Sequence, residues 1–559
     1  MYTFAQVIIR VLIMGPNFDL KEAVLEKGNV AAAICEAGFQ IGIGIVVSAS
    51  ISGPPSHFGY DLAGCLLMFG ISLLMMMLWS KLFDLYTRDW DTWAEIARGN
   101  IAAGISQFTQ LVCTCMLMAS SITKTWELST FFAWLVSGTV VRMVFRTVLD
   151  YCVIAPKFIN PRYSWSDLQI DKLILRGNWG AALIVGWLQL SVTAIINSFL
   201  PDMCEGFTYS DGRNVGLMSF EERLAGKEFV KLIWKWDRLG AIAIIFGVFI
   251  LARLPYDLRL RLHARLVNKK APHSSPGIDP DLNFYLVEPR KHAVSISFAA
   301  YMFSVGNMMV GVFKDANNVT SFVDSENPES WGLLLVQVAV GYVMIVVALF
   351  WSDFAILHKF NNVALMTQYD NRAVALVEAG SLIGSSFIIA AAINGWQVSD
   401  PPYGSAIIFF IASQLLFFVF QLIFEAMTKY DDEKEVQLGN AACGLNNGLN
   451  LIAVGMLLGR STYVSHSLVM LVCWALVTFP LIFFFRLITD LIVLPNINLE
   501  ATIECLDRLR PDIWVPARPC KQGNWGTALV AGTVTISLAQ LLNTFLRDCP
   551  FNMGIPGFA

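Results

Sequence analysis

Two glutamates stand within long apolar segments, where an ionisable side chain is costly and therefore informative. Glu36 and Glu378 each lie seven residues beyond the asparagine that begins the segment, Asn29 and Asn371 respectively. A carboxylate near the centre of a bilayer costs about 2.5–3.5 kcal/mol, so it normally faces a partner or a wet cavity. The chemistry open to such a pair is the passage of protons or cations.

Amide side chains occur at similar depths in other apolar segments, and with the glutamates they form a candidate polar pathway. Its members are Glu36, Gln40, Gln107, Gln110, Glu378, Asn447 and Asn450. In one interpretation these groups form hydrogen bonds between helices, worth about 0.6 kcal/mol each on average. In the other they line a route for protons, cations or a small solute at the interface between repeats. We favour the structural interpretation.

The sequence carries no motif of a catalytic or metal site. It contains no phosphate-binding GxxxxGKS/T, no esterase GxSxG and no zinc-binding HExxH. Its six histidines are scattered, and none forms a pair at metal-ligand spacing. We therefore expect no catalytic residues, no cofactor and no metal.

The apolar composition places the chain in a membrane. Hydrophobic residues make up 56% of the 559 residues and charged residues only 15%, with a mean hydropathy of +0.58. A soluble domain carries about 25% charged residues. A net charge of −4 offers no surface for nucleic acid. We expect an all-α polytopic transmembrane helical bundle, with the lipid bilayer as its main partner and no nucleic-acid partner.

One motif organises the chain: a polar loop, a Gly-Asn pair and an apolar helix rich in Ala and Gly. Its asparagines are Asn29, Asn100, Asn178, Asn440 and Asn524, together with Asn371, which follows Asp370 instead of glycine; a weaker copy begins near His292. A bulkier span precedes each motif helix, over roughly 60–82, 130–150, 239–256, 332–356, 404–427 and 466–490, with the N-terminal segment as a shortened seventh. This alternation of two-helix hairpins predicts about 13–14 spans.

The motif residues have local structural explanations. Asparagine is a strong N-cap, because its side chain accepts a bond from a helix N–H that lacks a partner. The alternative is that converging helix N-termini hold an anion or a headgroup phosphate. Glycines recur four residues apart at 38 and 42, 380 and 384, and 444 and 448. These pairs predict close packing between helices.

The chain also repeats at a higher level. The first three motif asparagines recur in order as Asn371, Asn440 and Asn524, and FRTVLD at 145–150 recurs as FRLITD at 485–490. We expect two pseudo-symmetric halves, 1–202 and 290–559, joined by a connecting region, 203–289, that contains one span. The basic segment 257–291, which includes Arg259 and Arg261, could bind anionic headgroups or a partner, but we expect a solvated linker.

Basic residues gather in the loops that precede the motif helices. The positive-inside rule puts these loops on the cytoplasmic face and both termini on the other face. No targeting motif identifies the compartment. Cys204 and Cys549 follow the third motif helix of each half, and their matched positions predict a disulfide between them.

The asparagine-initiated hairpins resemble a bacterial inner-membrane family, the YjfL-like domain of unknown function 350. The segment 19–125 carries Gly28-Asn29-Val30-Ala31-Ala32 and Gly99-Asn100-Ile101-Ala102-Ala103, and the segment 365–460 is the next most similar. We therefore expect two tandem copies of the family's domain plus further related hairpins. The resemblance implies a helical membrane fold, carries over no catalytic residues, and adds that the family is thought to accompany membrane-stress systems.

Two functions from different classes remain open. The first is a non-catalytic scaffold or accessory subunit, with other subunits of a membrane complex as its partners. The alternative is a channel or transporter for protons, cations or a small solute that uses Glu36 and Glu378.

Overall fold

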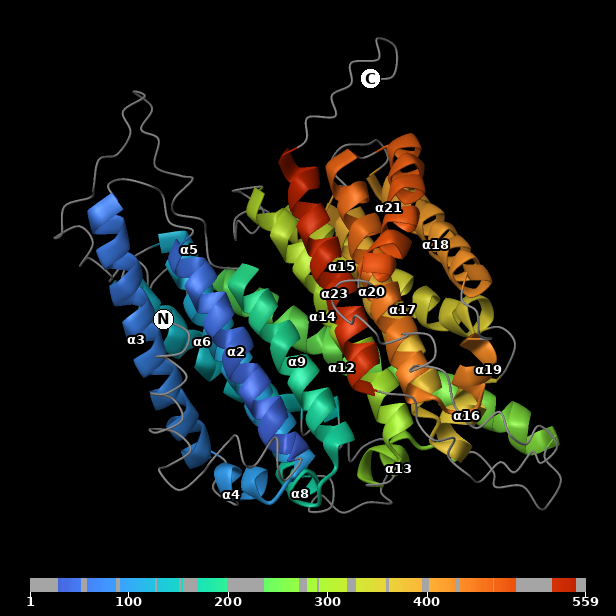
Figure 1. The fold of residues 1–559 in the computed structure, drawn as a ribbon, viewed down its shortest axis with the longest axis horizontal. Coiled ribbons are helices and arrows are strands. Elements are labelled where there is room, and N and C mark those ends of the chain that lie inside the picture. The colour runs from blue at the N-terminus through green and yellow to red at the C-terminus, as the bar shows by residue number, and fades with distance from the viewer. Residues whose placement is uncertain are drawn as a thin grey trace, which may run out of the picture. The chain divides into compact units, whose positions relative to one another are not determined.

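The computed structural model describes residues 29–51, 58–86, 91–125, 128–149, 152–153, 169–198, 236–270, 279–288, 291–318, 328–357, 361–394, 402–427, 432–465, 467–488 and 525–548. Within these residues all regular structure is helical, with 18 α-helices and the π-helix η3 (Ser352–Ile356) (Figure 1). The expected all-α fold is confirmed. Cys204, Cys549 and Asn524 lie outside the described residues.

The expected alternation of helices is confirmed. The motif helices are α2 (Val30–Ile51), α5 (Ile101–Thr125), α9 (Trp179–Ser198), α14 (His292–Asn318), α17 (Arg372–Asn394), α20 (Ala441–Ser465) and α23 (Trp525–Asp548). The bulky helices are α3 (Phe58–Tyr86), α6 (Leu128–Leu149), α12 (Trp236–Lys270), α15 (Pro328–Trp351), α18 (Pro402–Met427) and α21 (Leu468–Ile488). Short helices precede five motif helices: α4 (Thr92–Ala97), α8 (Ile170–Leu175), α13 (Leu282–Val287), α16 (Asn362–Tyr369) and α19 (Asp432–Gln437).

Eleven of the described helices are long and apolar enough to cross a membrane. In addition, α21 contributes a shorter apolar stretch, Leu468–Phe484. With α23 as the last motif helix, this agrees with a polytopic bundle of the expected kind. The N-terminal segment, which would supply a further span, lies outside the described residues.

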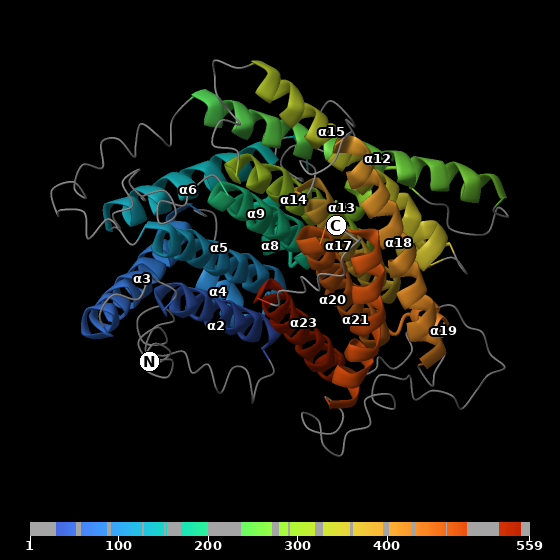
Figure 2. The ribbon, with the colours of Figure 1, turned by 90° about the horizontal axis from the view of Figure 1, so that it is seen from above.

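The chain forms two compact units. The first comprises Met1–Asp257, Asp281–Ser295 and Ala316–Trp331, and the second Leu258–Pro280, Ile296–Asp315 and Gly332–Ala559. In the first unit α5 packs against α2, α9, α6 and α3, and in the second α20 packs against α17, α23, α21 and α18. Figure 2 shows α5 among its neighbours from above. Motif helices therefore form the centre of each unit.

Burial separates the two kinds of helix. Within their apolar windows, 72–83% of the residues of α5, α9, α14, α17 and α20 are buried, against 28–44% for α3, α6, α12, α15 and α18. The first motif helix, α2, is 44% buried. Exposed leucines and valines cover the bulky helices, as a surface in contact with lipid requires. Small residues face other helices, and large apolar residues face outward.

Close approach of backbones explains the glycine pairs. A Cβ on Gly38 would lie 2.8 Å from the Cα of Phe108 on α5. In the second unit, Cβ atoms on Gly380 and Gly448 would collide with the facing backbone of α20 and α17 respectively. Because lipid offers no hydrophobic drive between helices, this contact area is a main source of their association.

The Gly-Asn pair closes one helix and opens the next. Gly99, Gly177 and Gly439 follow the short helices with φ of 88°, 74° and 89°, a left-handed conformation that suits glycine at a helix C-terminus. The N–H of the next residue returns to the short helix, as Asn100 does to the Glu95 carbonyl at 3.0 Å. Asp370 holds the equivalent position at φ 51°, which aspartate tolerates. The motif is therefore a C-cap followed directly by an N-cap.

Each described motif asparagine accepts a hydrogen bond from the first turn of its own span. The Oδ1 atoms of Asn29, Asn100, Asn178, Asn371 and Asn440 accept from the N–H groups of Ala32, Ala103, Ala181, Val374 and Cys443, at 3.0–3.4 Å. These bonds satisfy N–H groups that the helix itself leaves unpaired.

The amide nitrogens of four of these asparagines reach the short helix that precedes the next motif helix. Asn29, Asn100, Asn178 and Asn371 donate to the carbonyls of Ile96, Ile174, Leu286 and Val436 at 2.7–2.9 Å. Each asparagine therefore ties its repeat to the following one. Because the amide N–H groups of these asparagines already donate to backbone carbonyls, the bonds disfavour the interpretation that the asparagines hold an anion.

Candidate functional site

Glu378 is paired with a buried arginine in the second unit. It lies on α17 with none of its surface exposed. Arg259 of α12 donates from Nη1 and Nη2 to the two carboxylate oxygens, each at 2.7 Å. The hydroxyl of Ser297 on α14 donates to Oε1. A bidentate Arg–carboxylate pair is among the strongest charge-assisted interactions.

Asp353 supplies the second carboxylate of this cluster. It accepts from Arg259 Nε at 2.8 Å and from Nη2, and from the amide of Asn362 at 3.2 Å. Asp353 lies in the π-helix η3, a wider turn of a kind that is frequent at functional sites. His263 Nε2 lies 3.9 Å from Asp353 Oδ2. We call Arg259, Asp353 and Glu378, with Ser297 and Asn362, the Arg259 cluster.

Residues 257–270, at the start of the expected solvated linker, lie on a helix. Helix α12 continues to Lys270 without a break, and Arg259 has none of its surface exposed. Arg261, two residues later, is exposed. A signal was present in the sequence, because leucines continue at 258, 260, 262 and 266 and no helix breaker follows before residue 271. The basic residues 259–270 therefore lie on a helix that continues past Pro255 and not in a linker.

Glu36 has different surroundings. It is half-buried on α2, and its Oε1 accepts from the amide of exposed Gln40 on the same helix at 3.2 Å. Glu36 lies in the first unit and Glu378 in the second. A route that uses both glutamates therefore stays a prediction.

Two candidate glutamines belong to a polar group in the first unit. Gln110 on α5 accepts from Arg142 Nη2 at 2.6 Å and donates to Gln189 on α9. Arg142, on α6, also lies 3.4 Å from Gln189 Oε1. Gln107, fully buried, donates to Ser80 on α3 at 2.8 Å.

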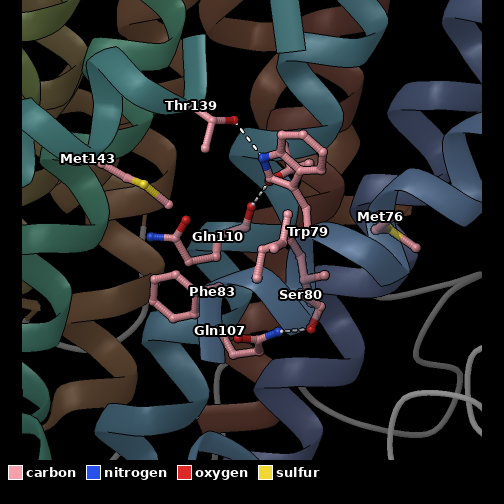
Figure 3. A pocket seen from close by; sticks show the side chains of 11 residues that line it. Met76, Trp79, Ser80, Phe83, Gln107, Gln110, Thr139 and Met143 are labelled. Atoms are coloured by element: carbon pink, nitrogen blue, oxygen red, sulfur yellow. Dashed lines mark hydrogen bonds between the residues drawn. The ribbon is translucent and has the colours of Figure 1, made fainter. Parts of the chain in front are cut away.

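A small cavity of about 60 Å³ lies between α3, α5 and α6. Gln107, Gln110, Ser80, Thr114 and Thr139 contribute its polar wall, while Trp79, Phe83, Met76, Met143, Leu82 and Leu111 contribute its apolar wall. Figure 3 shows Gln107 bonded to Ser80 and the indole of Trp79 bonded to Thr139. A water needs about 10–15 Å³ of such volume, so the cavity has room for several.

Asn447 and Asn450 lie on α20 in the second unit. Both are buried, with 3% and 4% of their surface exposed. The Oδ1 atom of Asn447 has no hydrogen-bond partner among the described residues. The structure therefore brings Gln107 and Gln110 to one cavity, and it places the remaining pathway candidates elsewhere on their own helices.

Acidic, histidine and cysteine side chains do not gather into a metal site in the part of the chain that the structure describes. No group of three or more of them stands where it could hold an ion. The candidate chemistry is therefore that of two polar groups inside a helical bundle: the Arg259 cluster and the cavity beside Arg142.

These features define an integral multi-pass membrane protein of helical hairpins with buried ionic groups. The family model named Domain of Unknown Function (DUF350) matches residues 1–51, 57–200, 282–393 and 398–546, and the chain belongs to this family. The four matched segments confirm the resemblance and extend it beyond the two tandem copies expected. Neither a curated protein nor a solved structure matches the chain.

Proposed function

We propose that the protein is a non-catalytic scaffold or accessory subunit of a larger membrane complex. The observation that carries the proposal is the packing of the motif helices, whose glycines bring backbones into direct contact at Gly380 and Gly448 and at Gly38 and Phe108. Helices in such contact leave no continuous lumen between them. A rigid bundle whose outer helices present large apolar residues suits the assembly of other membrane proteins around it.

The state of Glu378 supports the same proposal. Both of its carboxylate oxygens accept hydrogen bonds from Arg259, and Oε1 also accepts one from the hydroxyl of Ser297. A carboxylate that conducts protons or cations must exchange partners, whereas breaking a buried ion pair by removing one partner costs about 3–5 kcal/mol. This makes Glu378 a structural group in our proposal rather than a carrier.

The test combines flux with assembly. Purified full-length protein in liposomes is expected to conduct protons, alkali cations and small anions no faster than protein-free liposomes. Native mass spectrometry of mildly solubilised membranes is expected to show a second membrane subunit at fixed stoichiometry. Flux that Glu36→Gln abolishes while the protein stays folded would overturn the proposal, as would a chain found alone at native expression levels.

The cavity beside Gln107 and Gln110 favours a second candidate, the passage of a small polar solute. Both glutamines belong to the polar pathway suggested by the sequence, and the cavity has room for several waters. Solute uptake into the same liposomes tests this function. It requires uptake by the wild type that falls in Gln107→Leu, with Gln437→Leu at the exposed end of α19 as the matched control.

A further inference from the structure

Arg142 differs from every other buried arginine among the described residues. Four arginines there have 3% or less of their surface exposed: Arg142, Arg146, Arg253 and Arg259. Arg146 pairs with Asp171, Arg253 with Asp257, and Arg259 with Asp353 and Glu378. The partners of Arg142 are the neutral amide oxygens of Gln110 and Gln189, and its Nε has no hydrogen-bond partner. Its positive charge is therefore not balanced by the described residues.

The surroundings of Arg142 increase this imbalance. Arg142 lies within the membrane-spanning stretch Phe131–Val148. Its charged neighbour is Arg146, a second cation one turn further along α6, and the thiol of Cys113 lies nearby on α5. A buried thiol in apolar surroundings behaves as a small neutral hydrophobe. An isolated charge in a medium of low dielectric constant is strongly unfavourable unless an opposite charge lies close by.

The side chain of Gln110 lies between Arg142 and the cavity. Gln110, which accepts from Arg142, is part of the cavity wall, as are Thr139 and Met143 on either side of Arg142 along α6. The hydroxyls of Thr114 and Thr139 in this wall already donate to backbone carbonyls of their own helices. The amide of Gln107 lies beside Ser80 (Figure 3). The amide of Gln107 is therefore the group of this wall that is able to turn a donor toward an anion.

Gln107 provides a second, independent observation. It is fully buried at the cavity, its Nε2 donates to Ser80 at 2.8 Å, and its Oε1 has no partner in the part of the chain that the structure describes. The two ends of an amide exchange places on a 180° rotation, and the Ser80 hydroxyl is able to donate as well as accept. After this rotation Ser80 donates to Oε1, and the amide N–H groups face the cavity. An anion there satisfies both ends of the amide.

We propose that this cavity binds a small monovalent inorganic anion of the size of chloride or bromide, which balances the charge of Arg142. The charge of Arg142 attracts the ion across Gln110, and the rotated amide of Gln107 donates to it. The volume of about 60 Å³ admits an ion of this size and excludes bulky anions such as gluconate. The site goes beyond the proposed function, because a scaffold and a transporter are equally able to hold such an ion.

The test uses full-length protein in nanodiscs of zwitterionic lipid, with sodium chloride, bromide or gluconate at equal ionic strength. We expect chloride and bromide to raise the midpoint of thermal unfolding of the wild type relative to gluconate. Arg142→Gln is expected to fold, since it removes a lone buried charge, and to weaken bromide affinity by roughly thirtyfold or more. Arg98→Gln, which alters a side chain that is 72% exposed, is the matched control and keeps the halide effect.

A second variant separates the cavity from the charge. Thr114→Leu fills the cavity, leaves Arg142 and the Gln107–Ser80 bond in place, and is expected to abolish the halide effect. Equal stability of the wild type in chloride and gluconate would overturn the proposal, as would a halide effect that survives in Arg142→Gln. Stabilisation by anionic lipid in gluconate, without any halide effect, would identify a lipid headgroup as the counter-ion and overturn the small-ion site.

Discussion

Arg259 and Glu378 lie 119 residues apart in the sequence and share two parallel hydrogen bonds of 2.7 Å inside the second unit. Both residues are buried. Asp353 holds the remaining edge of the same guanidinium. One arginine on a long bulky helix thus holds together a motif helix and a π-helix, and the burial of all three charges depends on this contact.

Removal of Arg259 is expected to destabilise the protein strongly. Arg259→Gln leaves Asp353 and Glu378 as two neighbouring carboxylates without a cation, and losing one member of a buried ion pair costs about 3–5 kcal/mol. Arg261→Gln on the exposed face of the same helix should change stability by about 0.5 kcal/mol or less. Unfolding of both variants in nanodiscs measures the difference, and equal stability would show that the cluster contributes nothing.

Asn29 is expected to stabilise α2 through its amide oxygen and the contact with α4 through its amide nitrogen. Asn29→Ala loses the cap on Ala32, at about 0.5–2 kcal/mol, and also the bond to the Ile96 carbonyl. Asn29→Asp keeps the capping acceptor at a helix N-terminus but loses the donor. Amide hydrogen exchange should therefore rise around α4 in both variants and in the first turn of α2 only in Asn29→Ala. Unchanged exchange at α4 in the aspartate variant would contradict the link between repeats.

Glycines of one helix are expected to respond oppositely to alanine. Gly38→Ala forces a Cβ against the Phe108 backbone, and overpacking of this kind costs about 1–3 kcal/mol. A Cβ at Gly44, also on α2, meets nothing within 4 Å. Gly44→Ala should be neutral or stabilising by up to about 1 kcal/mol, since alanine favours a helix more than glycine does. Thermal unfolding of the two variants side by side decides the matter, and a similar loss in both would argue against close packing at Gly38.

Replacing the glycine of the left-handed turn is expected to destabilise the protein, whereas introducing a glycine at the equivalent turn is not. Gly439→Ala meets no atom within 4 Å but must hold φ near 89°, which costs an L-residue about 1–2 kcal/mol. Asp370→Gly, at the equivalent turn, relaxes the backbone and loses a partly exposed ion pair with Arg372, so the net change should be about 0.5 kcal/mol or less. Chemical denaturation of both variants provides the check, and a larger loss in Asp370→Gly would mean that this side chain has a structural role of its own.

Properties that repeat along the chain could be predicted from the sequence. The alternation of bulky and motif helices, the positions of the spans and the glycines of the helix contacts follow from the length and spacing of apolar and small residues. The N-capping geometry at Asn29 and Asn178 is equally local, because a cap and the turn it closes involve residues three positions apart. The sequence by itself therefore determined the class of fold and its repeating unit.

The pairing of polar side chains was decided by the tertiary structure. Glu36 and Glu378 occupy the same place in their repeats, yet one is half-buried beside Gln40 and the other is enclosed with Arg259. Arg142 and Arg259 both lie on bulky helices, and only the second meets a carboxylate. A partner on another helix depends on which faces pack together and at what depth, and spacing along one chain carries no information about that. For this reason the sequence located the polar residues, and only the packed helices separated an arginine that meets carboxylates from one that meets amides.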